Sequence, residues 1–130
     1  MSDNYAFGKV VALDFDAAIV KATAALKEQG FGVLSDIDVA ATLKAKIGAE
    51  IPPYRILGAC NPAFAHQALG LDPSLGLLLP CNVVVRQDEA GAVHVEFIDP
   101  DKMLSIVPDP RMSGIAAEVR SRLERACAAL

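Results

Sequence analysis

Three times in the first half of the chain, an alternating apolar segment leads directly into a residue that favours the start of a helix. These residues are Asp14, Asp38 and Asn61, and Pro62 follows Asn61 at the first helical position, where proline is favoured. Turn signals of this kind recur at short intervals, without a repeat, a linker or a low-complexity tract between them. The pattern predicts one compact domain of strands and helices.

The hydrophobic periodicity predicts the order β-α-β-α-β-α-β-β-α. Strands are expected at about residues 5–13, 31–37, 54–60, 81–86 and 93–98, where apolar side chains alternate. Helices are expected at about residues 14–29, 38–47, 61–69 and 110–129, where apolar side chains recur every three or four positions. Gly30, Gly48 and Gly70 are expected to end the first three helices. A largely antiparallel sheet with helices mainly on one face would bury these apolar stripes, so we expect an α+β single domain over residues 1–130.

Composition excludes several classes of protein. The chain has 130 residues, of which 53% are hydrophobic and 22% charged, so it can bury a core and is not disordered. Its net charge of −4 argues against a nucleic-acid partner. The longest uncharged stretch, residues 56–71, is too short and too broken to span a membrane, and no signal peptide is expected. Three cysteines, an odd number, favour free thiols and a cytoplasmic location.

The common catalytic motifs are absent from the sequence. It has no glycine-rich phosphate loop, no Gly-x-Ser-x-Gly, no Cys-x-x-Cys and no His-Glu-x-x-His. No metal site is therefore predicted, no cofactor is indicated, and a non-enzymatic role is favoured over an enzymatic one.

Two segments each place a Cys-Asn pair beside a proline. The first lies where a strand passes into a helix, and the amides of a helix N-terminus stabilise a thiolate and lower its pKa. The second opens the following strand, so the two sulfur atoms would approach if these strands are neighbours. A histidine lies about one and a half turns along the first helix. The candidate ligand or thiol site consists of Cys60, Asn61, Pro62, His66, Pro80, Cys81 and Asn82.

The cysteines and asparagines of this site, and two polar residues outside it, also have structural interpretations. Free cysteine is often a small buried hydrophobe, and asparagine commonly caps a helix. His94 is expected on the solvent face of a hairpin, and Asp99 in a simple turn.

The segment Tyr-Arg-Ile-Leu-Gly-Ala-Cys-Asn-Pro at residues 54–62, followed by Leu-Leu-Leu-Pro-Cys-Asn-Val-Val-Val at residues 77–85, resembles a bacterial and archaeal family, domain of unknown function 302. Residues 26–34 and 36–39 also match the pattern of that family. The resemblance covers about residues 5–109. It implies a small α+β domain and nominates the two Cys-Asn-proline segments as functional positions, but it implies no activity.

Three functions are compatible with these patterns. The first is a non-enzymatic binding or assembly module that forms a homodimer, because Leu57, Ala59 and Val84 are expected to form an apolar patch on the sheet face opposite the cysteines. The second is a thiol-centred site for redox exchange, sulfur handling or soft-metal binding at Cys60 and Cys81, with His66 nearby. The third is a small-molecule pocket between the sheet and the helices, lined by the cysteines.

Overall fold

A five-stranded antiparallel sheet forms the centre of the fold, in the strand order β1-β5-β4-β3-β2. The structure is a computed structural model and describes residues 4–130. The strands are β1 (Ala6–Val11), β2 (Gly32–Asp38), β3 (Tyr54–Cys60), β4 (Cys81–Gln87) and β5 (Val93–Ile98). The element order and the antiparallel sheet confirm the predicted fold class.

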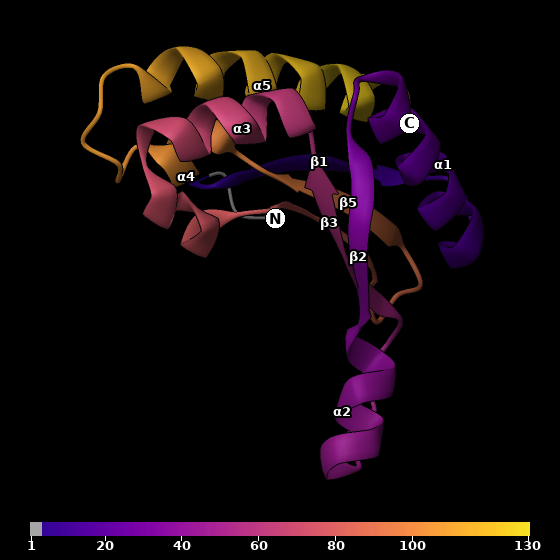
Figure 1. Ribbon diagram of the computed structural model, residues 1–130. Helices are drawn as coiled ribbons and strands as arrows, with labels where there is room; N and C mark the ends of the chain where they lie inside the picture. Colours follow the sequence, from indigo (N-terminus) through magenta and orange to yellow (C-terminus); the bar gives the residue numbers. More distant parts are fainter. Residues whose placement is uncertain (1–3) are drawn as a thin grey trace.

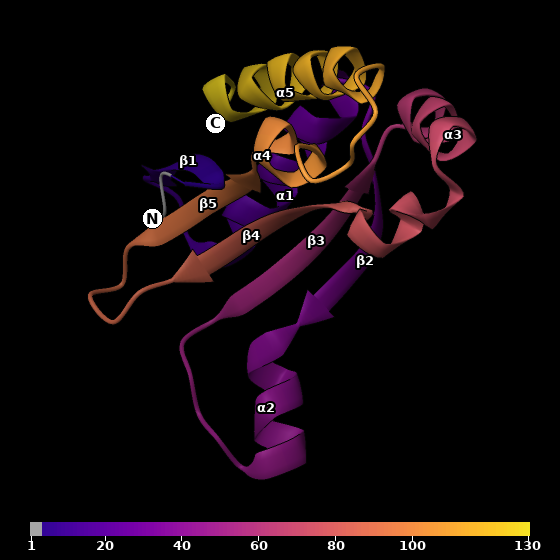
Figure 2. The ribbon, with the colours of Figure 1, turned by 90° about the vertical axis from the view of Figure 1, so that its left-hand side faces the viewer.

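One face of the sheet carries the helices that close the core (Figures 1 and 2). The two long helices, α1 (Phe15–Glu28) and α5 (Met112–Ala128), pack against the inward side chains of β4 and β5. The predicted inward faces of these strands are confirmed, because their apolar members are all buried: Cys81, Val83, Val85, Val93, Val95 and Phe97.

The three predicted capping residues form caps. The side chain of Asp14 accepts a hydrogen bond from the Ala17 amide at 2.8 Å and begins α1. Asp38 begins α2 (Val39–Ile47) in the same way, with its side chain 2.9 Å from the Ala41 amide. Asn61 begins α3 (Pro62–Leu71), in which Pro62 takes the first position. Each cap satisfies an amide that the first helical turn leaves without a partner.

The predicted helix ends are correct at two glycines and wrong at the third. Gly30 and Gly48 follow α1 and α2 with φ values of 86° and 68°, a backbone conformation that glycine adopts without a steric penalty. Gly70 lies inside α3, which continues to Leu71. The last helix also differs from the prediction. It begins at Met112, two residues after the predicted start at residue 110, and Asp109 accepts the Arg111 amide at 2.9 Å in the turn that precedes it.

Two short helices occupy segments without a predicted regular element. Residues Pro73–Leu78 form a 3-10 helix, η1, and residues Pro100–Leu104 form α4. Asp99 is not a simple turn residue: it caps α4, is only 8% exposed and pairs with Arg120 of α5. A second small core joins these elements to α3 and α5 through Ala68, Leu75, Leu104, Met112 and Ala116.

The sheet register corrects the predicted apolar patch. Ala59 is paired with Cys81 and Leu57 with Val83, so both lie on the helix-covered face and are 1% exposed. Directly paired residues on neighbouring strands point to the same side of a sheet. Of the three predicted patch residues, only Val84 lies on the uncovered face, where it is half-buried. A bulge between Val33 and Ser35 likewise breaks the predicted alternation of β2.

Helix α2 does not bury its predicted apolar stripe. Val39, Leu43 and Ile47 recur every four residues, yet none of the residues in α2 is buried. Figures 1 and 2 show α2 extending beyond the sheet, away from the other helices. The predicted helix is therefore present, but the chain covers its apolar side only in part, since Val39 and Leu43 are half-buried and Ile47 is exposed.

Candidate functional site

A cavity of about 380 Å³ lies where the ends of β3 and β4 meet the helices. Its walls come from β2, β3, β4, α3, η1, α4 and α5, so segments from much of the chain build it. The residues that line it are Phe31, Leu34, Ser35, Ala59, Cys60, Asn61, Phe64, Ala65, Ala68, Leu69, Leu75, Gly76, Leu79, Pro80, Cys81, Pro100, Met103, Leu104, Ile115 and Val119.

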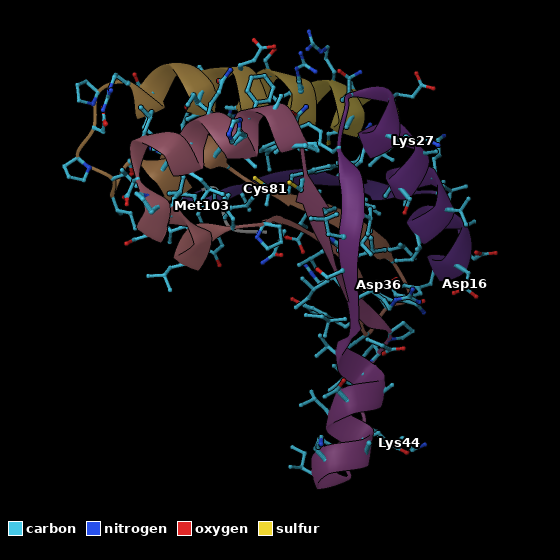
Figure 3. The ribbon with its side chains drawn as sticks, viewed as in Figure 1. Asp16, Lys27, Asp36, Lys44, Cys81 and Met103 are labelled. Carbon is cyan, nitrogen blue, oxygen red and sulfur yellow. The ribbon has the colours of Figure 1, made fainter. Side chains whose placement is uncertain are left out.

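The two candidate cysteines reach this cavity from neighbouring strands. Cys60 ends β3 and Cys81 begins β4, and antiparallel pairing places these two strand ends at the same edge of the sheet. Both thiols are free and both line the cavity. In Figure 3, Cys81 and Met103 lie beneath α3. The two strands are therefore neighbours, which is the condition under which the two sulfur atoms were predicted to approach.

The structure brings four of the seven candidate residues together. Cys60, Asn61, Pro80 and Cys81 line the cavity. The other three, Pro62, His66 and Asn82, are exposed and do not line it.

The electrostatic character of the cavity follows from its lining. Among the described residues that form its wall, none is charged, and the polar groups are a hydroxyl, an amide and two thiols. Burial raises the pKa of the Cys81 thiol to about 11, with a smaller contribution from Cys60 in the same direction. At neutral pH, Cys81 is therefore a protonated thiol, which is a weak hydrogen-bond donor and a poor nucleophile.

The aromatic wall of the cavity was not predicted. Phe64 of α3 is held from outside by Arg122 of α5, whose guanidinium carbon lies 5.1 Å from the ring centroid. Arg122 also donates to the backbone oxygen of Gln29 at 3.3 Å and pairs with Glu118. Phe64 and Arg122 are distant in sequence, and no local motif predicts that they meet. Helical periodicity alone indicates that Phe64 faces the core.

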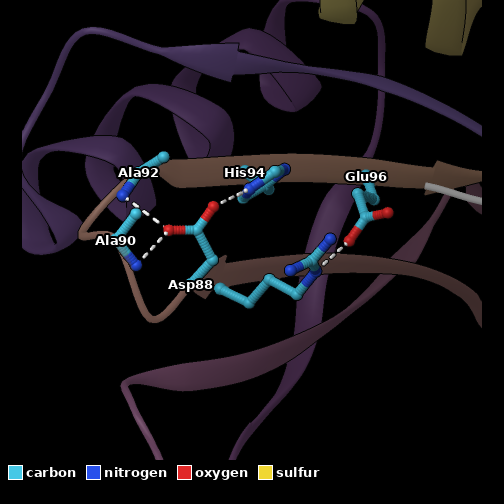
Figure 4. Close-up of polar contacts among 6 residues, drawn as sticks. Asp88, Ala90, Ala92, His94 and Glu96 are labelled. Atoms are coloured by element: carbon cyan, nitrogen blue, oxygen red, sulfur yellow. Dashed lines mark hydrogen bonds and ion pairs between the residues drawn. The ribbon is translucent and has the colours of Figure 1, made fainter.

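A polar cluster lies on the opposite, uncovered sheet face (Figure 4). His94 Nε2 lies 2.8 Å from Asp88 Oδ2, and Arg86 pairs with Glu96 beside them. His94 lies on the predicted face of the hairpin, but its side chain is only 16% exposed, so it is more enclosed than an ordinary surface histidine. The pKa of Asp88 is lowered, chiefly by the hydrogen bond with His94 and then by the Ala92 amide. None of these residues lines the cavity.

Residues 4–130 also bear on two other kinds of site. No group of three or more His, Cys, Asp or Glu side chains in this range is arranged to hold a metal ion. Within the same range, no helix has the length and apolar character needed to cross a bilayer.

Together, these features define a small α+β domain with an uncharged cavity at one end of an antiparallel sheet. The chain belongs to the family described as Domain of unknown function DUF302, whose family model matches residues 7–130. It is similar to the crystal structure of an uncharacterized conserved DUF302 protein from Bacillus stearothermophilus, with a TM-score of 0.88 and 30% sequence identity. That similarity covers 95% of this chain and 96% of the other. No curated protein matches the chain.

Proposed function

We propose that this protein is a non-enzymatic binding module that holds a small, uncharged and largely apolar molecule in the cavity at the ends of β3 and β4. The observation that carries this proposal is the combination of size and lining. The cavity of about 380 Å³ is within the usual range for small-molecule sites, about 300–1,000 Å³. An apolar cavity of roughly 150 Å³ already binds benzene, and this one has about two and a half times that volume.

The lining also indicates the chemistry of the ligand. A charged ligand would lose its hydration here without gaining a counter-charge, and that loss is costly. The phenyl rings of Phe31 and Phe64 favour an aromatic or aliphatic body. Asn61 and Ser35 can accommodate one or two polar groups of the ligand, such as a hydroxyl or a carbonyl.

The thiol-centred alternative has one supporting observation and two against it. Cys60 and Cys81 line the same cavity, as such a site requires. The raised pKa of Cys81 keeps that sulfur protonated, whereas nucleophilic attack and metal ligation both need the thiolate. His66, the third member of that predicted site, lies outside the cavity lining. We therefore favour a role of the thiols in lining the cavity.

We also propose that the protein is a homodimer of the cytoplasm. Exposed apolar side chains outside the covered face, among them Val10 and Ile37, support self-association. The free state of all three cysteines is compatible with a reducing compartment.

Titration with N-phenyl-1-naphthylamine, an uncharged fluorophore that brightens in apolar surroundings, tests the binding proposal. The test variant is Ala65→Phe, because Ala65 lines the cavity and a phenyl ring there would fill it. The matched control is Ala63→Phe, which places the same side chain on the same helix at an exposed position outside the lining.

We expect saturable binding by the native protein and by Ala63→Phe, with affinity at least tenfold weaker in Ala65→Phe. Thermal unfolding of each variant checks that the fold is retained. Equal binding by the two variants, or no saturable binding by the native protein, would contradict the proposal.

A further inference from the structure

Helix α2 is an isolated projection from the body of the protein. It has nine residues, none of them buried, and Figures 1 and 2 show it extending beyond the sheet. Helices shorter than about 12–15 residues are marginal in water without tertiary packing. The caps at Asp38 and Gly48 satisfy the ends of α2 but supply no packing for its sides. The single chain therefore covers α2 only in part: Val39 and Leu43 are half-buried, whereas Ile47 is 73% exposed.

We call the segment around α2, residues 37–53, the arm. Three isoleucines of the arm are exposed: Ile37 is 49% exposed, Ile47 is 73% exposed and Ile51 is 38% exposed. Such a concentration of exposed aliphatic side chains on one projection is typical of an interface.

A groove of about 420 Å³ separates the arm from the body. Its apolar wall carries two aromatic rings, Phe15 of α1 and Tyr54 of β3. The charged residues that line it have both signs: Lys44 is positive, and Asp38 and Glu50 are negative. The groove can thus receive an apolar side chain flanked by charged groups, and α2 itself presents such a surface.

We propose that the arm of one chain packs into the groove of a second copy, and the reverse, about a twofold axis. This inference rests on the proposed homodimer and identifies the surface that forms it. In such an interface, residue i of one copy meets residue j of the other while j meets i, so the patch must complement itself. Ile47 supplies the apolar side chain, and Lys44 of one copy faces Glu50 of its partner.

The charge of the arm favours a second copy as the occupant. Lys44 and Lys46 balance Asp38 and Glu50, so the arm has no net charge in a chain whose net charge is −4. Two copies can therefore approach through the arm without the repulsion that acts elsewhere on their surfaces. Lys44 and Glu50 lie 3.5 Å apart within one chain, and both are largely exposed and free to exchange partners.

Pairing through the sheet edge next to the arm is less favoured. The edge strand β2 contains the bulge between Val33 and Ser35 and carries Asp36 and Asp38. Bulges and charged residues on an edge strand both oppose edge-to-edge pairing. Helix α2 of the arm has no unpaired strand edge and carries charges of both signs, so neither obstacle applies to it.

Sedimentation velocity on the full chain tests the inference with Ile47→Asp and a matched control. The control is Val20→Asp, because Val20 is 70% exposed and lies on α1, outside the arm. We expect twice the chain mass of 13.7 kDa for the native protein and for Val20→Asp, and the mass of one chain for Ile47→Asp. Far-ultraviolet circular dichroism checks that both variants fold.

The outcomes separate this inference from the proposed homodimer. A native protein with the mass of one chain at millimolar concentration overturns both. If the native protein is a dimer and Ile47→Asp is still a dimer, the homodimer proposal stands but the arm is not its interface. Binding of N-phenyl-1-naphthylamine is measured in parallel, so the cavity proposal is judged separately.

A mixing experiment tests the charge pairing between chains. Lys44→Glu and Glu50→Lys each give the two positions a single sign, so each variant alone repels its own copy. We expect each alone to dimerise at least tenfold more weakly than the native protein, and an equimolar mixture to form mixed dimers at near-native strength. A mixture no stronger than its components would overturn the proposed Lys44–Glu50 contact.

Discussion

Ala59 of β3 and Cys81 of β4 are register partners and point to the same, helix-covered face of the sheet. This pairing places Leu57, two residues earlier, on the buried face and its neighbour Ile56 on the uncovered one. The same pairing brings the start of β4 beside the end of β3, where the cavity opens. Which side chains of β3 are buried therefore tests the fold around the site directly.

Truncating two neighbouring side chains of β3 shows which of them points into the core. We expect Leu57→Ala to lower the free energy of unfolding by about 3 kcal/mol, because it leaves a cavity in the core. Ile56→Ala should cost about 1 kcal/mol, since Ile56 is only partly buried. Urea denaturation followed by circular dichroism gives both values. Equal losses, or a larger loss at Ile56, would show that the register is wrong.

The ion pair between the buried Asp99 and the half-buried Arg120 joins α4 to α5. Asp99→Ala removes both the ion pair and the cap of α4, and we expect a loss of about 3 kcal/mol in the free energy of unfolding. Asp99→Asn keeps a capping side chain and should lose about 1 kcal/mol less. Asp109→Ala, which breaks an exposed pair with Arg111, should cost far less than either. Indistinguishable losses for Asp99→Ala and Asp99→Asn would rule out the cap.

The Asp88–His94 pair predicts a specific pH dependence of stability. Because the pKa of Asp88 in the folded state lies below its ordinary value of 3.8, its contribution is present above pH 3.8 and is lost as the pH falls through the folded pKa. Asp88→Asn should therefore lower the urea midpoint at pH 7. The difference from the native protein should shrink below pH 3.8. A difference that stays constant from pH 7 to pH 2.5 would contradict this assignment.

The thiol of Cys81 should react slowly with iodoacetamide. With a pKa of about 11, roughly one thiol in a thousand is ionised at pH 8, against about a quarter for an ordinary cysteine. In a Cys60→Ser/Cys127→Ser variant, alkylation of Cys81 should be about two orders of magnitude slower than that of the cysteine in a short unstructured peptide, and should accelerate towards pH 11. Rapid alkylation at pH 8 would restore the thiol-centred function.

Local sequence signals were sufficient to predict most of the elements. The caps at Asp14, Asp38 and Asn61 depend on hydrogen bonds within three residues, and their chemistry is visible in the sequence. Gly70 did not mark the end of α3, because glycine is tolerated inside a helix when the next residues continue the packing. The bulge in β2 and the register of β3 depend on partners far along the chain, so alternation alone misassigned Leu57 and Ala59.

The candidate site was predictable only in part. Cys60 and Cys81 were marked by two similar motifs, and their strands are neighbours, which the sequence left open. The apolar wall from Met103, Leu104 and Ile115 depends on the short helix α4 and on the approach of α5, which no local pattern specifies. His66 was included through its helical spacing from Cys60, but α3 presents it to solvent.

The most direct test of a ligand-binding cavity is native mass spectrometry of freshly purified protein. Our account predicts a noncovalent mass increment of a small molecule on the native protein and on Ala63→Phe, lost on denaturation and absent from Ala65→Phe. An increment that persists in Ala65→Phe would place the ligand elsewhere. Native protein without any increment, which also fails to bind the naphthylamine probe, would contradict the central claim.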